Sequence, residues 1–344
     1  MEMPVIILSG MPYERGFAHG RQFQDEIAHI LSRDVALRSN AALLEARKRA
    51  DMAFKAIWAT SLDVAEEIRG IAEGSRQPLA DIVLRCGFEL FKLGSDSGCS
   101  TVAAKSHAGA IVAQNWDAPV EKATELGLFL HFSRNGFEFA VVASLGGLGW
   151  VGMNRHGLAL VNNDLVLNGY TDGVPSQVVR RLALAEPDTK RATDTLMSMP
   201  HMGGRSYLIG DRTGHVAAAE VSAKTGTHFL PAADVQLHTN NALLAATSLE
   251  EDQPALLQTY PSSAARLDAL QATFAIAERS VEGLKKVLSD ETGSPNAVCK
   301  TASADEPTQT AFSIIMDCSA GEIHLAFGKP KPESYRKFIL PLGG

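Results

Sequence analysis

The sequence lacks a long hydrophobic segment. Within its 344 residues, no apolar run approaches the roughly 18 residues that a helix needs to cross a bilayer. Residues 1–10 carry an acid where a signal peptide has Lys or Arg, and their apolar stretch is short. We therefore expect a cytoplasmic protein that has no membrane partner.

The sequence also lacks an excess of positive charge. Its 32 Lys and Arg residues are outnumbered by 39 Asp and Glu residues, which gives a net charge of −7 at pH 7. No basic stripe stands out, so we expect neither nucleic acid nor an anionic membrane as a partner. Hydrophobic residues make up 45% and charged residues 21%, which is typical of a soluble globular protein with one large domain or two ordinary ones.

Cysteine is scarce, and no metal-binding pattern is present. The four cysteines, at 86, 99, 299 and 318, form no Cys-x-x-Cys pair, and their spacing suggests neither a disulfide framework nor a zinc site. The ten histidines include no pair spaced as helical metal ligands, so we expect no metal and no cofactor. Three cysteines are interpreted as buried, inert thiols. Cys99 differs, because the polar residues 95–98 before it predict an exposed loop.

One motif imitates a nucleotide site. Residues 147–152 match Gly-x-Gly-x-x-Gly, but that fingerprint requires a strand before it and a helix after it. Residues 153–158 continue instead as a strand hairpin, so we interpret the glycines as a turn or a close backbone approach. The sequence contains no Gly-x-Ser-x-Gly elbow and no phosphate-binding loop.

The chain changes character near Cys99. Before it, a short strand over 5–8 is followed by apolar periodicity that predicts helices over 15–31, 41–60, 61–73 and 79–92. After it, strand pairs alternate with helix pairs, which predicts an α+β layered sandwich. The predicted strands are 101–105, 110–114, 128–133, 137–144, 149–154, 158–162, 205–210, 215–221, 235–239, 311–317 and 322–327. The later predicted helices are 176–185, 192–199, 262–279 and 281–288, and 253–261 is predicted as a surface loop.

The pair Gly98-Cys99 suggests a specific chemistry. If the chain cuts itself between these residues, Cys99 becomes an N-terminal nucleophile whose freed α-amine serves as the base. That amine has an unperturbed pKa of about 7.7 to 8, so a useful fraction is neutral at pH 7. Polar residues also end three predicted strands, at 115–117, 162–164 and 240–241. Each set alone is typical of a turn, but together with Gly98-Cys99 they indicate a catalytic site.

Six segments, in order along nearly the whole chain, resemble the isopenicillin N acyltransferase family of self-processing N-terminal-nucleophile hydrolases. They are residues 10–20, 67–74, 98–101, 114–117, 173–176 and 238–240. The resemblance implies a four-layer αββα sandwich with a helical N-terminal segment. It also implies a mostly helical α chain, 1–98, and a catalytic β chain, 99–344, which remain one structural unit after cleavage. The two fragments would form a heterodimer, which could assemble further.

The resemblance also assigns roles. Cys99 is implied as the nucleophile, Asn240 as a contributor to the oxyanion site, and Asp117 as the residue that orients the nucleophile region. Glu220 and Ser222 match a family segment whose serine lies near the active site. The further supporting candidates are Ser100, Thr101, Asn115 and His238.

The chain departs from the family at one place. The penicillin-processing member has Ser-Arg ahead of the strand that corresponds to 311–317, whereas this chain has Glu306-Pro307. The partner of Asp117 and the shape of the substrate pocket are therefore left open.

We expect an enzyme that cleaves or transfers the acyl group of a small-molecule N-acyl amide through a Cys99 thioester. Hydrolysis is favoured over transfer, because transfer needs a pocket for a second substrate. Two alternatives stay open: an amidase like the bile-salt hydrolases, which begin almost at the nucleophile, and a non-catalytic small-molecule-binding protein on the same scaffold. The sequence names neither the acyl group nor the amine.

Overall fold

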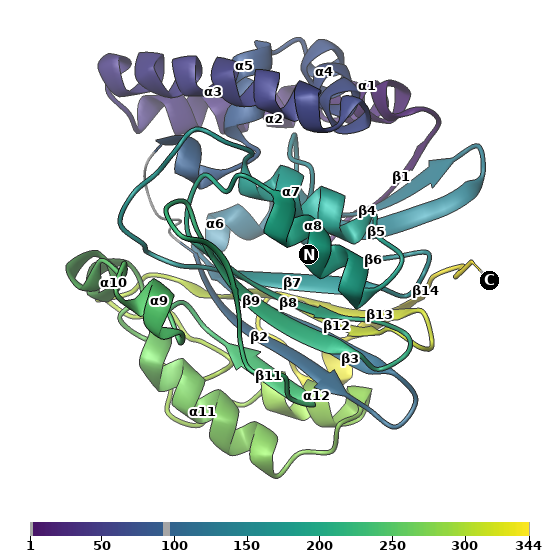
Figure 1. The fold of residues 1–344 in the computed structure, drawn as a ribbon, viewed down its shortest axis with the longest axis vertical. Coiled ribbons are helices and arrows are strands. Elements are labelled where there is room, and N and C mark those ends of the chain that lie inside the picture. The colour runs from purple at the N-terminus through teal and green to yellow at the C-terminus, as the bar shows by residue number, and fades with distance from the viewer. Residues whose placement is uncertain (1–2, 92–96, 344) are drawn as a thin grey trace.

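The computed structural model describes residues 3–91 and 97–343, and these residues form stacked layers of helices and sheets (Figure 1). In the described part of the chain, one sheet has eight strands and the other has six. In spatial order the first comprises β1 (Val5–Ser9), β4 (Leu126–Ser133), β5 (Gly136–Ser144), β6 (Val151–Asn154), β7 (Ala159–Asp164), β8 (Arg205–Gly210), β9 (Val216–Ser222) and β10 (Gly226–Phe229). The second comprises β11 (Val235–His238), β2 (Gly98–Lys105), β3 (Ala110–Ala118), β12 (Gln309–Asp317), β13 (Glu322–Phe327) and β14 (Arg336–Ile339).

Helices cover the outer faces of both sheets (Figure 1). The N-terminal helices are α1 (Pro12–Gln22), α2 (Gln24–Ala36), α3 (Asn40–Thr60), α4 (Leu62–Ser75) and α5 (Leu79–Leu84), followed by the short 3₁₀ helix η1 (Phe88–Phe91). With α7 (Ser176–Leu184) and α8 (Thr189–Ser198) they lie against the eight-stranded sheet. The six-stranded sheet is covered by α11 (Ser263–Ala275) and α12 (Val281–Leu288). The short elements are α6 (Val120–Ala123), α9 (Ala245–Ser248), α10 (Gln253–Thr259) and η2 (Pro332–Ser334).

Three buried apolar clusters correspond to the three interfaces between four layers. One lies between the two sheets, where Val112 of β3 and Leu208 of β8 are fully buried. A second joins the eight-stranded sheet to its helices, and a third joins the six-stranded sheet to α11 and α12. Successive side chains of a strand point to opposite faces of the sheet. Each sheet therefore contributes one face to the cluster between the sheets and its other face to a cluster with helices. The predicted α+β four-layer sandwich is confirmed.

The N-terminal segment is built into this sandwich. Its strand β1 pairs in parallel with β4 of the later segment, and its helices share a buried cluster with the eight-stranded sheet. Helices α1 and α4 meet backbone to backbone through glycines. A Cβ on Gly16 would lie 2.0 Å from the Glu67 carbonyl oxygen, and one on Gly70 would lie 2.2 Å from the Tyr13 carbonyl oxygen. This close approach accounts for the glycines in the segments 10–20 and 67–74.

Several predicted boundaries were wrong. The helix predicted over 15–31 is two helices, because the chain leaves helical geometry at Phe23. The helix predicted over 79–92 stops at Leu84, and residue 92 lies outside the described residues. The segment 253–261, predicted as a loop, contains α10. Its start is explained by Asp252, whose side chain accepts a hydrogen bond from the Ala255 N–H, and by a proline in the first turn.

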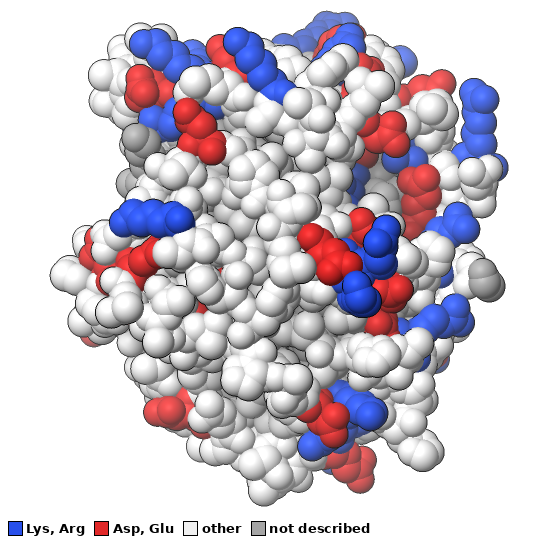
Figure 2. All heavy atoms as spheres, viewed as in Figure 1, with Lys and Arg blue, Asp and Glu red and all other residues white. Residues whose placement is uncertain are grey.

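The surface charge and the lengths of the helices agree with the composition. On the face shown in Figure 2, basic and acidic side chains are interspersed without a large area of one sign. Among the described residues, no helix is long and apolar enough to cross a membrane. No group of three or more His, Cys, Asp or Glu side chains in this part of the chain is placed to hold a metal ion.

Candidate active site

The hairpin of β2 and β3 builds the centre of the site. Its register places Gly98 opposite Asp117 and Cys99 opposite Trp116. Gly98 and Cys99 therefore begin a strand instead of ending a loop, and Cys99 is only 6% exposed. The prediction of an exposed Gly98-Cys99 was wrong, because pairing with β3 buries both residues, with Cys99 facing the other sheet and Gly98 facing Arg266 of α11. Residues 95 and 96 of the predicted loop lie outside the described residues.

The Cys99 thiol is held by a polar neighbour. The Gln114 side-chain amide donates to Cys99 Sγ at 3.2 Å. Burial raises the pKa of the thiol to about 12, the nearby Asp117 carboxylate acts in the same direction, and the Arg266 cation opposes both. In the continuous chain the thiol is therefore protonated at neutral pH, and a reaction through its thiolate would require a base.

Asn240 contacts the backbone nitrogen of Cys99. It follows β11, which pairs with β2, and its Oδ1 accepts a hydrogen bond from the Cys99 N–H at 2.9 Å. Its Nδ2 donates to the Asp164 carbonyl oxygen at 3.1 Å. The structure thus brings Asn240 to Cys99, with the amide oxygen facing the Cys99 nitrogen. The amide NH₂ has a second hydrogen, and its donation to an oxyanion stays a prediction.

Arg266 is a site residue that the sequence analysis missed. It is fully buried on α11 and donates to the Cys99 carbonyl oxygen, to Ser100 Oγ at 3.0 Å and to Asn240 Oδ1 at 2.7 Å. Because it holds both the Cys99 carbonyl and the Asn240 side chain, it fixes their relative position. A signal was available: Arg266 is spaced at i, i+4 and i+8 with Leu270 and Phe274, on the buried face of the helix.

The other predicted site residues on β2 and β3 differ in how close they lie to Cys99. The Thr101 hydroxyl lies 2.6 Å from Asn163 Oδ1, next to the Cys99 carbonyl, to which Asn163 Nδ2 donates. Asn115, however, points to the other face of the sheet, where it donates to the carbonyl oxygens of Leu288 and Val298. The structure does not bring Asn115 to the thiol.

Glu220 and His238 form a fully buried pair behind the site. Glu220 Oε1 lies 2.8 Å from His238 Nε2. Burial by itself would raise the pKa of Glu220, but hydrogen bonds from His238 and Thr247 outweigh burial and lower it. The pair ties β9 to the end of β11, directly before Asn240. Ser222, two residues along β9, contacts Glu250 and does not line the pocket that contains Cys99.

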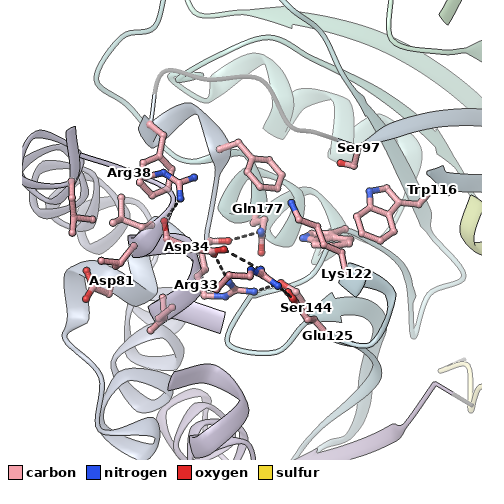
Figure 3. Close-up of a pocket in the computed structure, with 18 residues that line it drawn as sticks. Arg33, Asp34, Arg38, Asp81, Ser97, Trp116, Lys122, Glu125, Ser144 and Gln177 are labelled. Carbon is pink, nitrogen blue, oxygen red and sulfur yellow. Dashed lines mark hydrogen bonds and ion pairs between the residues drawn. The ribbon is translucent and has the colours of Figure 1, made fainter. Parts of the chain in front are cut away.

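Cys99 lies in an inner pocket of about 410 Å³, part of it open to solvent. Its lining residues are Phe88, Ser97, Cys99, Gln114, Trp116, Trp150, Asn162, Asp164, Arg180 and Arg205. An outer hollow of about 830 Å³ adjoins it and shares Phe88, Ser97, Trp116 and Trp150 (Figure 3). The rings of Trp116 and Trp150, with centroids 4.7 Å apart, thus lie where the two spaces meet. A small molecule can place one part beside the thiol and another in the hollow.

Comparison with known proteins identifies the family of this chain. The acyl-coenzyme A:6-aminopenicillanic acid acyl-transferase family matches residues 103–332. The chain belongs to this family. The acyl-coenzyme A:6-aminopenicillanic-acid-acyltransferase 40 kDa form of Emericella nidulans is 25% identical over 340 residues, which cover 94% of this chain and 92% of that protein. The resemblance seen in the sequence is confirmed.

Solved structures resemble this chain at lower sequence identity. A mutant of conjugated bile acid hydrolase from Clostridium perfringens has a TM-score of 0.47 and 12% identity, and the match covers 72% of this chain and 93% of that chain. Penicillin V acylase from Agrobacterium tumefaciens has a TM-score of 0.44 and 14% identity, with 67% and 82% covered.

The structure also answers the question raised by Glu306-Pro307 in this member of the family. Asp117 has a buried cation nearby, because Arg266 Nη1 lies 3.9 Å from Asp117 Oδ2. Thr310 donates to the other carboxylate oxygen at 2.8 Å. Burial raises the pKa of Asp117, whereas Arg266 and Thr310 oppose that rise. Glu306 lies 3.6 Å from the buried Lys300 and does not contact Asp117.

If the chain cuts itself at Gly98-Cys99, the raised pKa of Cys99 predicts how the rate depends on pH. A thiol with a pKa of about 12 is almost fully protonated up to pH 9, so its thiolate fraction rises about tenfold per pH unit. The rate of cleavage at Gly98-Cys99 is therefore expected to rise about tenfold per pH unit between pH 6.5 and 9. Chain made by cell-free synthesis, sampled over time on denaturing gels, measures this rate. A plateau below pH 8 would contradict the prediction.

Proposed function

We propose that this chain is a cysteine N-terminal-nucleophile enzyme that cleaves the acyl group from a small-molecule N-acyl amide after cutting itself between Gly98 and Cys99. One observation carries the proposal. The backbone nitrogen of Cys99 donates to Asn240, and Cys99 lines a pocket in which Gln114 contacts its thiol. Cleavage would convert that nitrogen into an α-amine already placed beside the thiol.

Self-cleavage follows from this arrangement. Cys99 Sγ attacks the Gly98 carbonyl carbon, the C–N bond breaks, and the nitrogen takes a proton as a thioester forms. Water then opens the thioester, which leaves a Gly98 carboxylate, a free thiol and a free amine. Three polar groups lie beside the bond to be cut: a Cβ on Gly98 would lie 3.1 Å from Arg266 Nη2, 3.4 Å from Asp117 Oδ2 and 3.5 Å from Asn240 Oδ1.

The cut enzyme uses the same atoms on a substrate. The neutral α-amine of Cys99 removes the thiol proton, and the thiolate attacks the amide carbonyl carbon. The protonated amine then gives its proton to the departing nitrogen, which leaves the acyl group on sulfur. Water releases the acyl group as an acid, and an amine in its place would give acyl transfer. The NH₂ of Asn240 would stabilise the oxyanion of each step.

The test is the intact mass of the purified wild-type protein under denaturing conditions. We expect two fragments, 1–98 and 99–344, that stay associated under native conditions, because β1 and the N-terminal helices belong to the shared sandwich. A chain that remains whole after prolonged incubation at pH 8 would contradict self-processing. If the whole chain also hydrolyses no amide, the non-catalytic alternative would replace the proposal.

A further inference from the structure

The charged groups of the inner pocket are not equally partnered. Arg205 forms ion pairs with Asp164 and with Glu89, the latter at 3.0 Å. Arg180 instead makes only neutral contacts: its Nε and Nη2 donate to Ser176 at 3.0 and 3.1 Å, and its Nη1 donates to Asn162 Oδ1 at 2.8 Å. Among the described residues, no carboxylate oxygen lies within 4 Å of the Arg180 guanidinium.

Arg180 stands apart from the other buried arginines. Arg15 lies 2.8 Å from Glu138, Arg181 lies 2.8 Å from Glu67, and Arg266 lies 3.9 Å from Asp117. Arg180 is also buried, at 8% exposure. A buried cation without a paired anion carries a desolvation cost, which an incoming anion would offset. Of its five N–H groups, two have no acceptor in the described part of the chain.

A short chain of contacts links Arg180 to the thiol. Gln114 donates to Cys99 Sγ through its amide nitrogen, and its Oε1 accepts from the Asn162 N–H at 3.0 Å. Asn162 Oδ1 in turn accepts from Arg180. Two residues, Gln114 and Asn162, therefore link the guanidinium to the thiol, and both line the same pocket. An anion on Arg180 and an amide beside Cys99 would share that pocket.

The outer hollow beyond Trp116 and Trp150 has a mixed lining. Its apolar side chains are Leu31, Val35, Leu43, Leu84, Phe88 and Phe91. Most of its charged side chains are paired: Arg33, Asp34, Arg85 and Glu125 with one another, and Asp81 with Arg47. Burial of an apolar acyl group there would be favourable, because it removes apolar surface of both the ligand and the hollow from water. The larger space suits the acyl part of a substrate, and the smaller inner pocket suits the amine part.

We propose that Arg180 binds a carboxylate on the amine part of the substrate, so that the substrates are N-acyl amino acids with an apolar acyl group. This rests on the proposed function, because it assumes that Cys99 attacks the amide. In an N-acyl α-amino acid a single carbon joins the amide nitrogen to the carboxylate. With that short spacing the carboxylate can face Arg180 while the amide lies beside Cys99, because both residues line one small pocket. An Arg–carboxylate contact with two N–H donors also fixes the orientation of the amide.

The test compares two amides that differ only in charge: N-octanoylglycine and N-octanoylglycinamide. In cut wild-type enzyme we expect kcat/KM to be about 10- to 100-fold higher for the carboxylate, the range for a hydrogen-bonded charge. In Arg180→Gln this ratio should fall to about one, and in Arg180→Lys, which keeps the charge but not the fork, it should be intermediate. Arg191→Gln, the same change at an exposed position on α8, is the matched control and should keep the wild-type ratio.

Each outcome decides between the two proposals. Equal rates for the two amides in cut wild-type enzyme overturn the role of Arg180 and leave the proposed function in place. A preference for the carboxylate that survives in Arg180→Gln assigns the anion site to another group, which also overturns it. Failure of the cut enzyme to hydrolyse either amide contradicts the substrate class, and failure of the chain to cut itself contradicts the proposed function. Variants are compared only after their cleavage at Gly98-Cys99 has been verified by mass.

Discussion

Cys99→Ala is expected to leave the chain whole and without amidase activity. Alanine has no atom that can attack the Gly98 carbonyl carbon, so no thioester forms and the α-amine is never released. The substituted position is buried and small, so the variant should fold. Intact mass measures the first loss, and hydrolysis of an N-acyl amino acid measures the second. A cut Cys99→Ala chain, or an active one, would exclude the N-terminal-nucleophile mechanism.

Cys99→Ser separates the two steps. A hydroxyl can still perform the acyl shift, so slow cleavage is expected. Turnover should fall steeply, because a hydroxyl is far less acidic than a thiol. Iodoacetamide should inactivate the cut wild-type enzyme by alkylating one residue, which peptide mapping should locate at Cys99.

The other three cysteines provide matched controls. Cys86, Cys299 and Cys318 are 1% exposed or less, and burial raises the pKa of each thiol. Their alanine variants should cleave themselves normally and lose only about 1 kcal/mol of unfolding free energy, as is common for a small buried group. Loss of self-cleavage in one of these variants, with retention in Cys99→Ala, would move the nucleophile to that residue.

Asn240→Ala is expected to lower kcat of the cut enzyme by about 10²- to 10³-fold, with little change in substrate binding. Alanine would remove two functions. The Oδ1 of Asn240 accepts from the Cys99 nitrogen and from Arg266, and we propose that the second hydrogen of its NH₂ donates to an oxyanion. Steady-state kinetics on protein verified as cut provides the measurement. An unchanged kcat would remove Asn240 from the site.

Asn240→Asp distinguishes the two duties. Aspartate keeps an oxygen for the Cys99 nitrogen and for Arg266 but has no NH₂ to donate. If the oxyanion role dominates, Asn240→Asp should be as slow as Asn240→Ala. If the placement of the amine dominates, Asn240→Asp should retain more activity and shift the pH profile of kcat, because its charge faces that amine. Asn135→Ala, an exposed change in a distant hairpin, is the control and should match wild type.

The sequence alone determined much of this molecule, because its strongest signals are local. Alternation of apolar residues predicted most strands after Cys99, and β8 has the predicted bounds, Arg205–Gly210. Six motif segments in order identified the family. The pair Gly98-Cys99 suggested the nucleophile, because a Gly-Cys step ahead of a strand is readable from adjacent residues.

The neighbours of Cys99 were decided only by tertiary structure. Arg266 lies 167 residues from Cys99 along the chain, and only the packing of α11 on the six-stranded sheet brings its guanidinium to the Cys99 carbonyl. The burial of Cys99 depends on strand pairing, which a polar approach loop does not reveal. Arg180 looks like any other helical arginine in the sequence. Among the described residues it has no carboxylate partner. Only the three-dimensional structure shows this, because ion pairing depends on distances that sequence spacing does not encode.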